Sequence, residues 1–266
     1  MTMRPFRFGV VAPILTDLAS WQDSARRIAD LGYSTLLMPD VPGFQPAPGP
    51  ALAIAAAAAD LRVGSWVYAA ALRQPWSTAR EAHSLTMLTG GRFEMGIGLG
   101  RPGIETEQGL PKVSGAERLR RVQETISVLR ELDGPEQRTP VVMAVRGPRS
   151  RELAAEVADT VTFVLDAGDD RVLIERSVRE FAAGRDIELA QHVGVVGDAR
   201  AAFMAAPGTD TAALRAADSL FRLPDDPSAV VDELQRRREE IGLSYYVFGA
   251  AFAELLAPAV GQLAGR

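Results

Sequence analysis

Short runs of apolar residues alternate along the chain with longer segments whose apolar positions recur every three or four residues. The short runs are compact, as in parallel strands that are buried on both faces. They predict strands at 6–11, 35–38, 61–68, the second half of 89–100, 141–145, 160–165, 193–196 and 245–248. The longer segments between them have the spacing of amphipathic helices.

Helix boundaries follow the same alternation. Ser20 with Asp23 and Ser114 with Glu117 have the spacing of capping boxes. Pro227 suits the first turn of a later helix, because proline there loses no backbone hydrogen bond. A strand followed by a helix, repeated to the end of 266 residues without a linker or a charge run, predicts a (β/α)8 TIM barrel, one domain over 1–266. A doubly wound open sheet is the alternative fold.

The segment 89–100, with the sequence TGGRFEMGIGLG, is unusually rich in glycine. The two glycines at its start can adopt the positive φ that ends a helix. Gly96, Gly98 and Gly100 alternate along the predicted strand, so one face of this strand carries no side chains. A bare face indicates that backbone or a ligand approaches closely. A glycine-rich corner of the barrel is the other interpretation.

Composition narrows the classes of function. The net charge of −5 argues against binding to nucleic acid or to an anionic membrane, and 47% hydrophobic residues are typical of a globular core. The chain has no cysteine and two histidines, so we expect neither disulfides nor a metal site made by the protein alone. With no secretory signal evident and no apolar run long enough for a bilayer, we expect a cytoplasmic protein.

Candidate catalytic groups are few. In a barrel, chemistry takes place where strands end and the next loops begin, and the acids in such positions are Asp40, Glu105 and Glu107. His83 falls inside a predicted helix and His192 precedes a predicted strand, so packing is favoured over a role as base for both. No Gly-x-Ser-x-Gly motif is present, and no histidine lies near a plausible serine nucleophile.

The segment Arg146-Gly147-Pro148-Arg149-Ser150 follows the fifth predicted strand and leads into a helix. Free N–H groups and the dipole at a helix N-terminus add to the charge of guanidinium groups, and this combination can bind an anion. Solvated surface arginines are the alternative interpretation. The glycines of 96–100 do not form a dinucleotide-binding motif, because no helix follows them directly.

Six segments together carry a resemblance to a known family: 32–40 (GYSTLLMPD), 61–67 (LRVGSWV), 73–75 (RQP), 89–100, 237–247 (RREEIGLSYYV) and 263–266 (LAGR). They resemble the bacterial luciferase-like monooxygenases, and most closely the branch that depends on the deazaflavin coenzyme F420. The resemblance covers nearly the whole chain. It implies a barrel that holds a deazaflavin or flavin across its strand ends and transfers hydride to or from a small organic substrate.

The resemblance also implies roles for residues. Asp40 matches the acidic residue after the second strand and, with Glu105, is a catalytic candidate. The bond between Tyr68 and Ala69 falls where the family often has a non-prolyl cis peptide beneath the cofactor ring. The loop 146–150 takes the place of the loop that holds the phosphate end of the cofactor. The residues expected to bind the cofactor are therefore Tyr68, Ala69, Arg101, Arg146, Gly147, Arg149 and Ser150.

Three features depart from the family pattern. Val41 stands where a histidine is common, Gly147 is a single glycine where the phosphate loop commonly has several, and 223–226 (LPDD) replaces a segment that usually contains glycine. Two interpretations follow. Arginines have replaced backbone N–H groups as phosphate ligands, or the barrel no longer binds the cofactor.

Three functions are therefore open. The first is an oxidoreductase that uses F420, or FMN as a variant. The second is a cofactor-free barrel that acts as a partner subunit or binding protein, and the third is a repurposed hydrolase such as a peptidase. We expect Phe44, Tyr68 and Trp76 to line the substrate pocket. Because the family usually dimerises and the segment near 52–59 is rich in alanine, we also expect a homodimer or a heterodimer with a related barrel.

Overall fold

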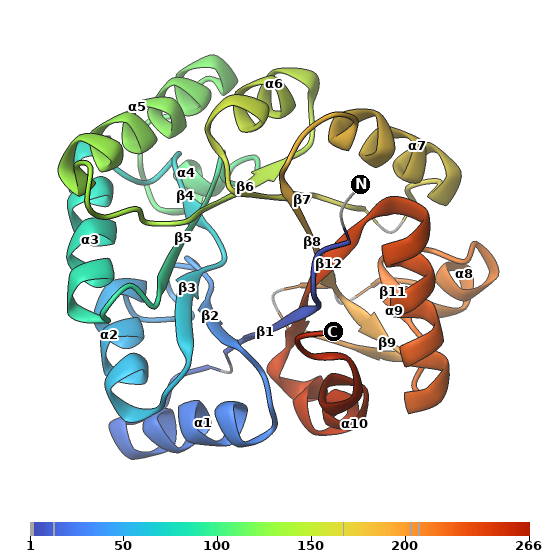
Figure 1. Cartoon of the computed structure of the whole chain (residues 1–266). Helices are drawn as coiled ribbons and strands as arrows, with labels where there is room; N and C mark the ends of the chain where they lie inside the picture. The colour runs from blue at the N-terminus through green and yellow to red at the C-terminus, as the bar shows by residue number, and fades with distance from the viewer. Residues whose placement is uncertain (1–2, 13, 167, 203, 207) are drawn as a thin grey trace.

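A ring of strands enclosed by helices forms the body of the protein (Figure 1). The computed structural model describes the chain except residues 1–2, 13, 167, 203 and 207. The strands of the main sheet are β1 (Arg7–Val11), β2 (Thr35–Met38), β3 (Arg62–Ser65), β4 (Tyr68–Ala69), β5 (Phe93–Gly98), β6 (Val141–Val145), β7 (Thr160–Phe163), β8 (Glu188–Val193) and β12 (Leu243–Gly249).

The helices fill the intervals between the strands and lie outside the ring. They are α1 (Leu18–Asp30), α2 (Pro48–Ala58), α3 (Pro75–Leu88), α4 (Ile104–Glu107), α5 (Gly115–Asp133), α6 (Pro148–Val157), α7 (Arg171–Ala182), α8 (Thr211–Ala216), α9 (Pro227–Ile241) and α10 (Ala253–Leu263), with a 3-10 turn η1 (Ala250–Phe252) before the last. Among the described residues, no helix is both long enough and apolar enough to cross a membrane.

The main sheet closes on itself. Its strand order is β3-β2-β1-β12-β8-β7-β6-β5-β4, and an additional parallel pairing joins β3 to β5. In the described part of the chain β4 is a short extra strand beside β5, and the other eight strands form a closed parallel barrel. This confirms the predicted (β/α)8 barrel and excludes the open sheet, because an open sheet has no pairing between its ends.

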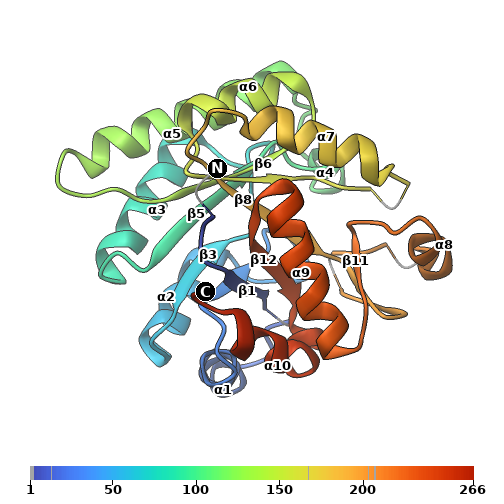
Figure 2. The same cartoon turned by 45° about the vertical axis from the view of Figure 1, so that its right-hand side comes forward.

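One predicted strand was wrong. The seventh barrel strand is β8, which precedes the predicted 193–196, whereas Val195–Val196 forms β9. β9 pairs with β10 (Ala199–Arg200) and β11 (Arg222–Leu223) in a separate three-stranded sheet. The chain changes sheets at Gly194, where a Cβ atom would lie 2.3 Å from the Phe221 ring. Figure 2 shows α8 beyond β11, at the side of the barrel.

Two further boundaries differ from the sequence prediction. The predicted strand 61–68 is interrupted after β3 and resumes as β4. Helix α1 begins at Leu18 because the Asp17 side chain caps it by accepting a hydrogen bond from the backbone N–H of Ser20, at 2.9 Å. The proposed capping role of Ser20 is therefore wrong. Ser114 caps α5 as predicted, by accepting from the N–H of Glu117 at 3.1 Å.

The inside of the barrel is apolar toward one end and charged toward the other. Val11, Leu37 and Val247 pack together around Tyr245. The Tyr245 hydroxyl donates to Glu94 Oε1 at 2.6 Å, and Arg7 donates to the other oxygen of that carboxylate at 3.0 Å. Because Arg7 and Glu94 lie at or near the first residues of their strands, this polar layer fills the amino-terminal end. The opposite, carboxyl end is left for a ligand.

Candidate active site

A cleft of about 390 Å³ opens at the carboxyl ends of β2, β3 and β5. Its polar side chains are Asp40, Arg101, Glu107 and Gln108. Its apolar part consists of Pro39, Val41, Pro42, Phe44, Trp66, Val67, Ala69 and Ile104. The volume lies within the range of small-molecule sites, and mostly apolar walls with a few polar groups are typical of them.

The glycines of β5 permit the close approach of backbone that builds this cleft. A Cβ atom on Gly96 would lie 2.0 Å from the carbonyl oxygen of Ser65 at the end of β3. A Cβ on Gly98 would lie 3.1 Å from Val67, which lines the cleft. The face of β5 without side chains is therefore in close contact with the segment that follows β3. This agrees with the interpretation that backbone approaches these glycines closely.

The position expected for the cis peptide bond was wrong. The cis bond joins Trp66 to Val67, between β3 and β4. Tyr68 and Ala69 instead form β4, in parallel register with Ile97 and Gly98 of β5. The expected pair is thus part of the regular sheet.

Asp40 is fixed at the edge of the cleft by two neighbours. Its Oδ2 atom accepts from the backbone N–H of Ala69 at 3.1 Å and from Arg73 Nε at 2.8 Å. The Arg73 guanidinium lies 4.0 Å above the ring of Tyr68, whose hydroxyl donates to Glu81 at 2.6 Å. Burial, assisted by the Glu81 charge, raises the pKa of Tyr68 well above its usual value. Tyr68 therefore supports the site from behind and does not line the cleft, contrary to expectation.

The two acids after β5 have different environments. Glu107 lines the cleft and forms an ion pair with Arg101. Glu105 is fully buried, and both its oxygens accept from Arg118 Nη2 at 2.6 Å. Hydrogen bonds from its own N–H, from Val113 and from Arg118 lower its pKa. Glu105 was expected to be catalytic, but it does not line the cleft, because its carboxylate pairs with Arg118 in the protein interior.

The loop 146–150 follows β6, the neighbour of β5, and so reaches the same end of the barrel. Ser150 Oγ accepts from the N–H of Arg146 at 3.2 Å and donates to the carbonyl of Gly147 at 2.8 Å. Arg146 forms an ion pair with Asp166. Among the described residues, the Arg149 side chain and the backbone N–H groups of Arg149 and Ser150 make no hydrogen bond. The loop is therefore ordered, and its remaining donors are available to an anion.

The histidines lie away from the cleft. His83, on α3 as predicted, places Nδ1 2.9 Å from Asp133. His192 lies within β8 rather than before a strand, with its ring 5.5 Å from that of Phe221, and burial lowers its pKa to about 4. In the described part of the chain, no group of three or more His, Cys, Asp or Glu side chains could hold a metal ion.

Some cleft residues were not identified from the sequence. Phe44 lines the cleft as expected, whereas Trp76 on α3 does not. Trp66 and Val67 do line it, but the predicted strand ran through them. Gly96 and Gly98 of β5 were the available signal, because a Cβ at either glycine would be close to Ser65 or Val67, where the segment between β3 and β4 leaves the regular sheet.

Fold and cleft together define a (β/α)8 barrel with a small-molecule cleft at the carboxyl ends of its strands. The family model for luciferase-like monooxygenases matches residues 6–134, which include all the residues that line this cleft. The match covers slightly under half of the chain and agrees with the resemblance found in the sequence.

Solved structures match over nearly the whole length. The coenzyme F420-dependent tetrahydromethanopterin reductase from Methanopyrus kandleri has a TM-score of 0.73 at 19% identity, over 98% of each chain. An F420-dependent secondary alcohol dehydrogenase in complex with an F420-acetone adduct has 0.70 at 15%, over 96% of this chain and 99% of its own. EDTA monooxygenase from Chelativorans sp. BNC1 has 0.70 at 14%, over 97% and 94%. No curated protein sequence matches the chain.

Proposed function

We propose that the chain is an oxidoreductase that uses coenzyme F420 to transfer hydride to or from a small organic substrate. FMN is the alternative cofactor. The observation that carries the proposal is the arrangement of two features at adjoining strand ends. One is the apolar cleft beside β5, and the other is the anion-binding loop 146–150 after β6.

The donor set fits such a cofactor. The apolar walls formed by Trp66, Val67 and Ile104 suit a flat ring system. Arg149 and the first N–H groups of α6 suit a phosphate, because guanidinium charge and a helix N-terminus both favour an anion. Two of the similar structures are F420-dependent by name, which supports F420 over FMN.

A bound deazaflavin supplies the hydride chemistry. Trp66 and Val67 would exclude water from one side of the cleft. Asp40, fixed by Arg73, would accept a hydrogen bond from the substrate or from the ring, and it is our catalytic candidate. Arg101 and Ala69 would contact the ring region, and Gly147, Arg149 and Ser150 would hold the phosphate with Arg146. Tyr68 contributes indirectly, by supporting the Arg73 side chain that holds Asp40.

Titration of the purified protein with F420 and with FMN, followed by fluorescence, tests this proposal. We expect F420 to bind, and we expect Arg149→Gln to weaken binding about tenfold, the loss of one charge-assisted contact. Arg176→Gln is the matched control, because Arg176 is exposed on α7 and pairs with Glu180 along that helix. Asp40→Asn is expected to lower turnover more than F420 affinity.

A lack of binding by both cofactors at about 50 µM, where a micromolar site would be filled, contradicts the proposal. That result would favour the second candidate, a cofactor-free barrel that acts as a binding protein or partner subunit. The ion pair between Arg146 and Asp166 supports this candidate, because Asp166 already balances the charge of Arg146.

A further inference from the structure

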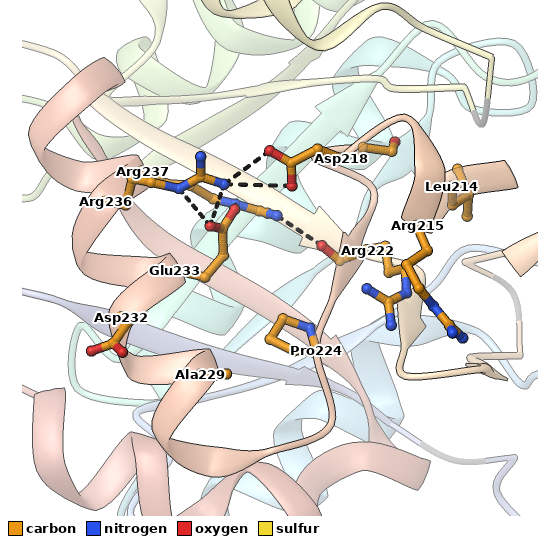
Figure 3. Close-up of a pocket in the computed structure, with 11 residues that line it drawn as sticks. Leu214, Arg215, Asp218, Arg222, Pro224, Ala229, Asp232, Glu233, Arg236 and Arg237 are labelled. Carbon is orange, nitrogen blue, oxygen red and sulfur yellow. Dashed lines mark hydrogen bonds and ion pairs between the residues drawn. The ribbon is translucent and has the colours of Figure 1, made fainter. Parts of the chain in front are cut away.

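A second pocket of about 400 Å³ lies between α8, β11 and α9, at the side of the barrel (Figure 3). It shares no lining residue with the cleft at the strand ends. Leu214, Pro224 and Ala229 give it an apolar part, and most of its other lining residues are charged. Four of them are arginines, so the pairing of each guanidinium determines what the pocket can bind.

Two of the arginines are already balanced. Arg237 is almost fully buried, and it donates to Glu233 at 2.5 Å and to the backbone carbonyl of Arg222 at 2.7 Å. Arg236 donates to Glu233 at 2.7 Å and to Asp218 at 3.1 Å (Figure 3). These contacts neutralise the α9 wall and fix the backbone of β11 against it.

The other two arginines keep unused donors. Among the described residues, the Arg222 side chain donates only through Nε, to the Gly197 carbonyl at 2.9 Å, although a guanidinium carries five N–H groups. Within the part of the chain that the structure describes, Arg215 pairs with Asp198 through Nη2 alone. Arg215 and Arg222 line the same pocket, and the hydrogen bond from Arg215, with the charges of both guanidinium groups, lowers the pKa of Asp198. Asp225 adds a second negative charge near Arg215.

We propose that this pocket binds a phosphate monoester. The phosphate group lies between Arg215 and Arg222, whose terminal N–H groups match its oxygens in the forked geometry that guanidinium groups favour. The organic part lies against Leu214, Pro224 and Ala229. The pocket is larger than a phosphate ion requires, which favours a monoester over the free ion. This inference does not depend on the proposed redox function.

Isothermal titration calorimetry with phenyl phosphate, inorganic phosphate and phenol tests the proposal. We expect phenyl phosphate to bind in this pocket more tightly than inorganic phosphate, while phenol does not bind. Arg222→Gln and Arg215→Gln are each expected to weaken phenyl phosphate binding about tenfold or more. Arg222→Lys keeps the charge but not the fork, so it is expected to fall between Arg222→Gln and the unchanged protein.

One control separates this pocket from other arginines. Arg176→Gln removes an exposed charge on α7 that lies in neither proposed site. It is not expected to change phenyl phosphate affinity. Thermal unfolding of each variant without ligand reports folding, and Arg215 is exposed, so its replacement is expected to leave the fold intact.

Four results would overturn the proposal. They are no binding of phenyl phosphate at about 10 mM, equal affinity for inorganic phosphate, unchanged affinity in both Arg215→Gln and Arg222→Gln, and equal weakening in Arg176→Gln. The first rejects binding, the second rejects the monoester, the third rejects the location, and the fourth indicates a general charge effect.

Discussion

The side chain of Arg118 holds the loop that carries the cleft residues after β5. Its guanidinium donates to both oxygens of Glu105 at 2.6 Å, to the carbonyls of Gly100 and Arg101 at 2.9 and 3.2 Å, and to that of Val113 at 3.3 Å. Arg118→Met keeps much of the aliphatic volume but removes every one of these donors. A buried carboxylate then loses its charged partner.

Loss of one member of a buried ion pair typically costs about 3–5 kcal/mol, and we expect Arg118→Met to lower the free energy of unfolding by this amount. The measurement is urea denaturation at neutral pH. Replacing both members with apolar residues removes the unpaired charge, so Arg118→Met/Glu105→Leu is expected to be more stable than Arg118→Met alone. Because the loop also carries Arg101, affinity for the proposed cofactor F420 is expected to fall in both variants.

A loss below about 1 kcal/mol, the range of exposed pairs, would refute this reasoning. So would strictly additive losses in the double variant, because additivity means that the two side chains do not interact. Arg118→Lys separates charge from geometry. It keeps the cation but cannot reach all the carbonyls at once, and we expect an intermediate loss of stability.

Three other predictions follow from buried groups. Gly96→Ala is expected to prevent folding or to destabilise the protein severely, because its Cβ would lie 2.0 Å from the Ser65 carbonyl oxygen in β3. Gly98→Ala is expected to destabilise the protein far less, because its Cβ would lie 3.1 Å from the Val67 side chain. Soluble yield and thermal unfolding compare the two variants. Tyr245→Phe removes a buried donor to the Glu94 carboxylate, and we expect a loss of about 1.5–3 kcal/mol in urea unfolding. Burial lowers the pKa of His192 to about 4, so the unfolded chain binds a proton at a higher pH than the folded protein does. The free energy of unfolding is therefore expected to be highest above pH 6.5 and to fall between pH 6.5 and 4, by at most roughly 1.4 kcal/mol per pH unit. His192→Gln should flatten this dependence, and an unchanged pH profile would contradict it.

Most of the barrel could be predicted because its strands are continuous apolar runs between helix signals. β2 and β6 have the predicted ends, since a compact apolar run stops at a polar or breaking residue on each side. β8 was misplaced for a physical reason. It contains Glu188 and Gln191, whose polar groups are satisfied by Arg7 and Arg237, far away in the sequence. Its apolar pattern is therefore weaker than that of Val195–Val196, which lies in the small sheet.

The glycines of β5 could be interpreted only in part. Their alternation indicated a close approach, and the structure shows that the approaching atom at Gly96 is the carbonyl oxygen of Ser65. Backbone and ligand were equally good explanations from the sequence, because both need the same empty volume. The distinction rests on the break between β3 and β4, and that break has no signature of its own in the segment 61–68.

The acids after β5 mark the limit of inference from chain order. Glu105 and Glu107 are two residues apart in one loop, and position alone makes them equivalent candidates. Because α4 turns between them, Glu105 faces Arg118 in the protein interior while Glu107 meets Arg101 at the cleft. The sequence separates Arg118 from Glu105 by a loop and the first turn of α5, so no local pattern indicates the pair. Which acid reaches a ligand is thus decided by a partner arginine, and Asp40 and Glu107 are the carboxylates that this arrangement leaves at the cleft.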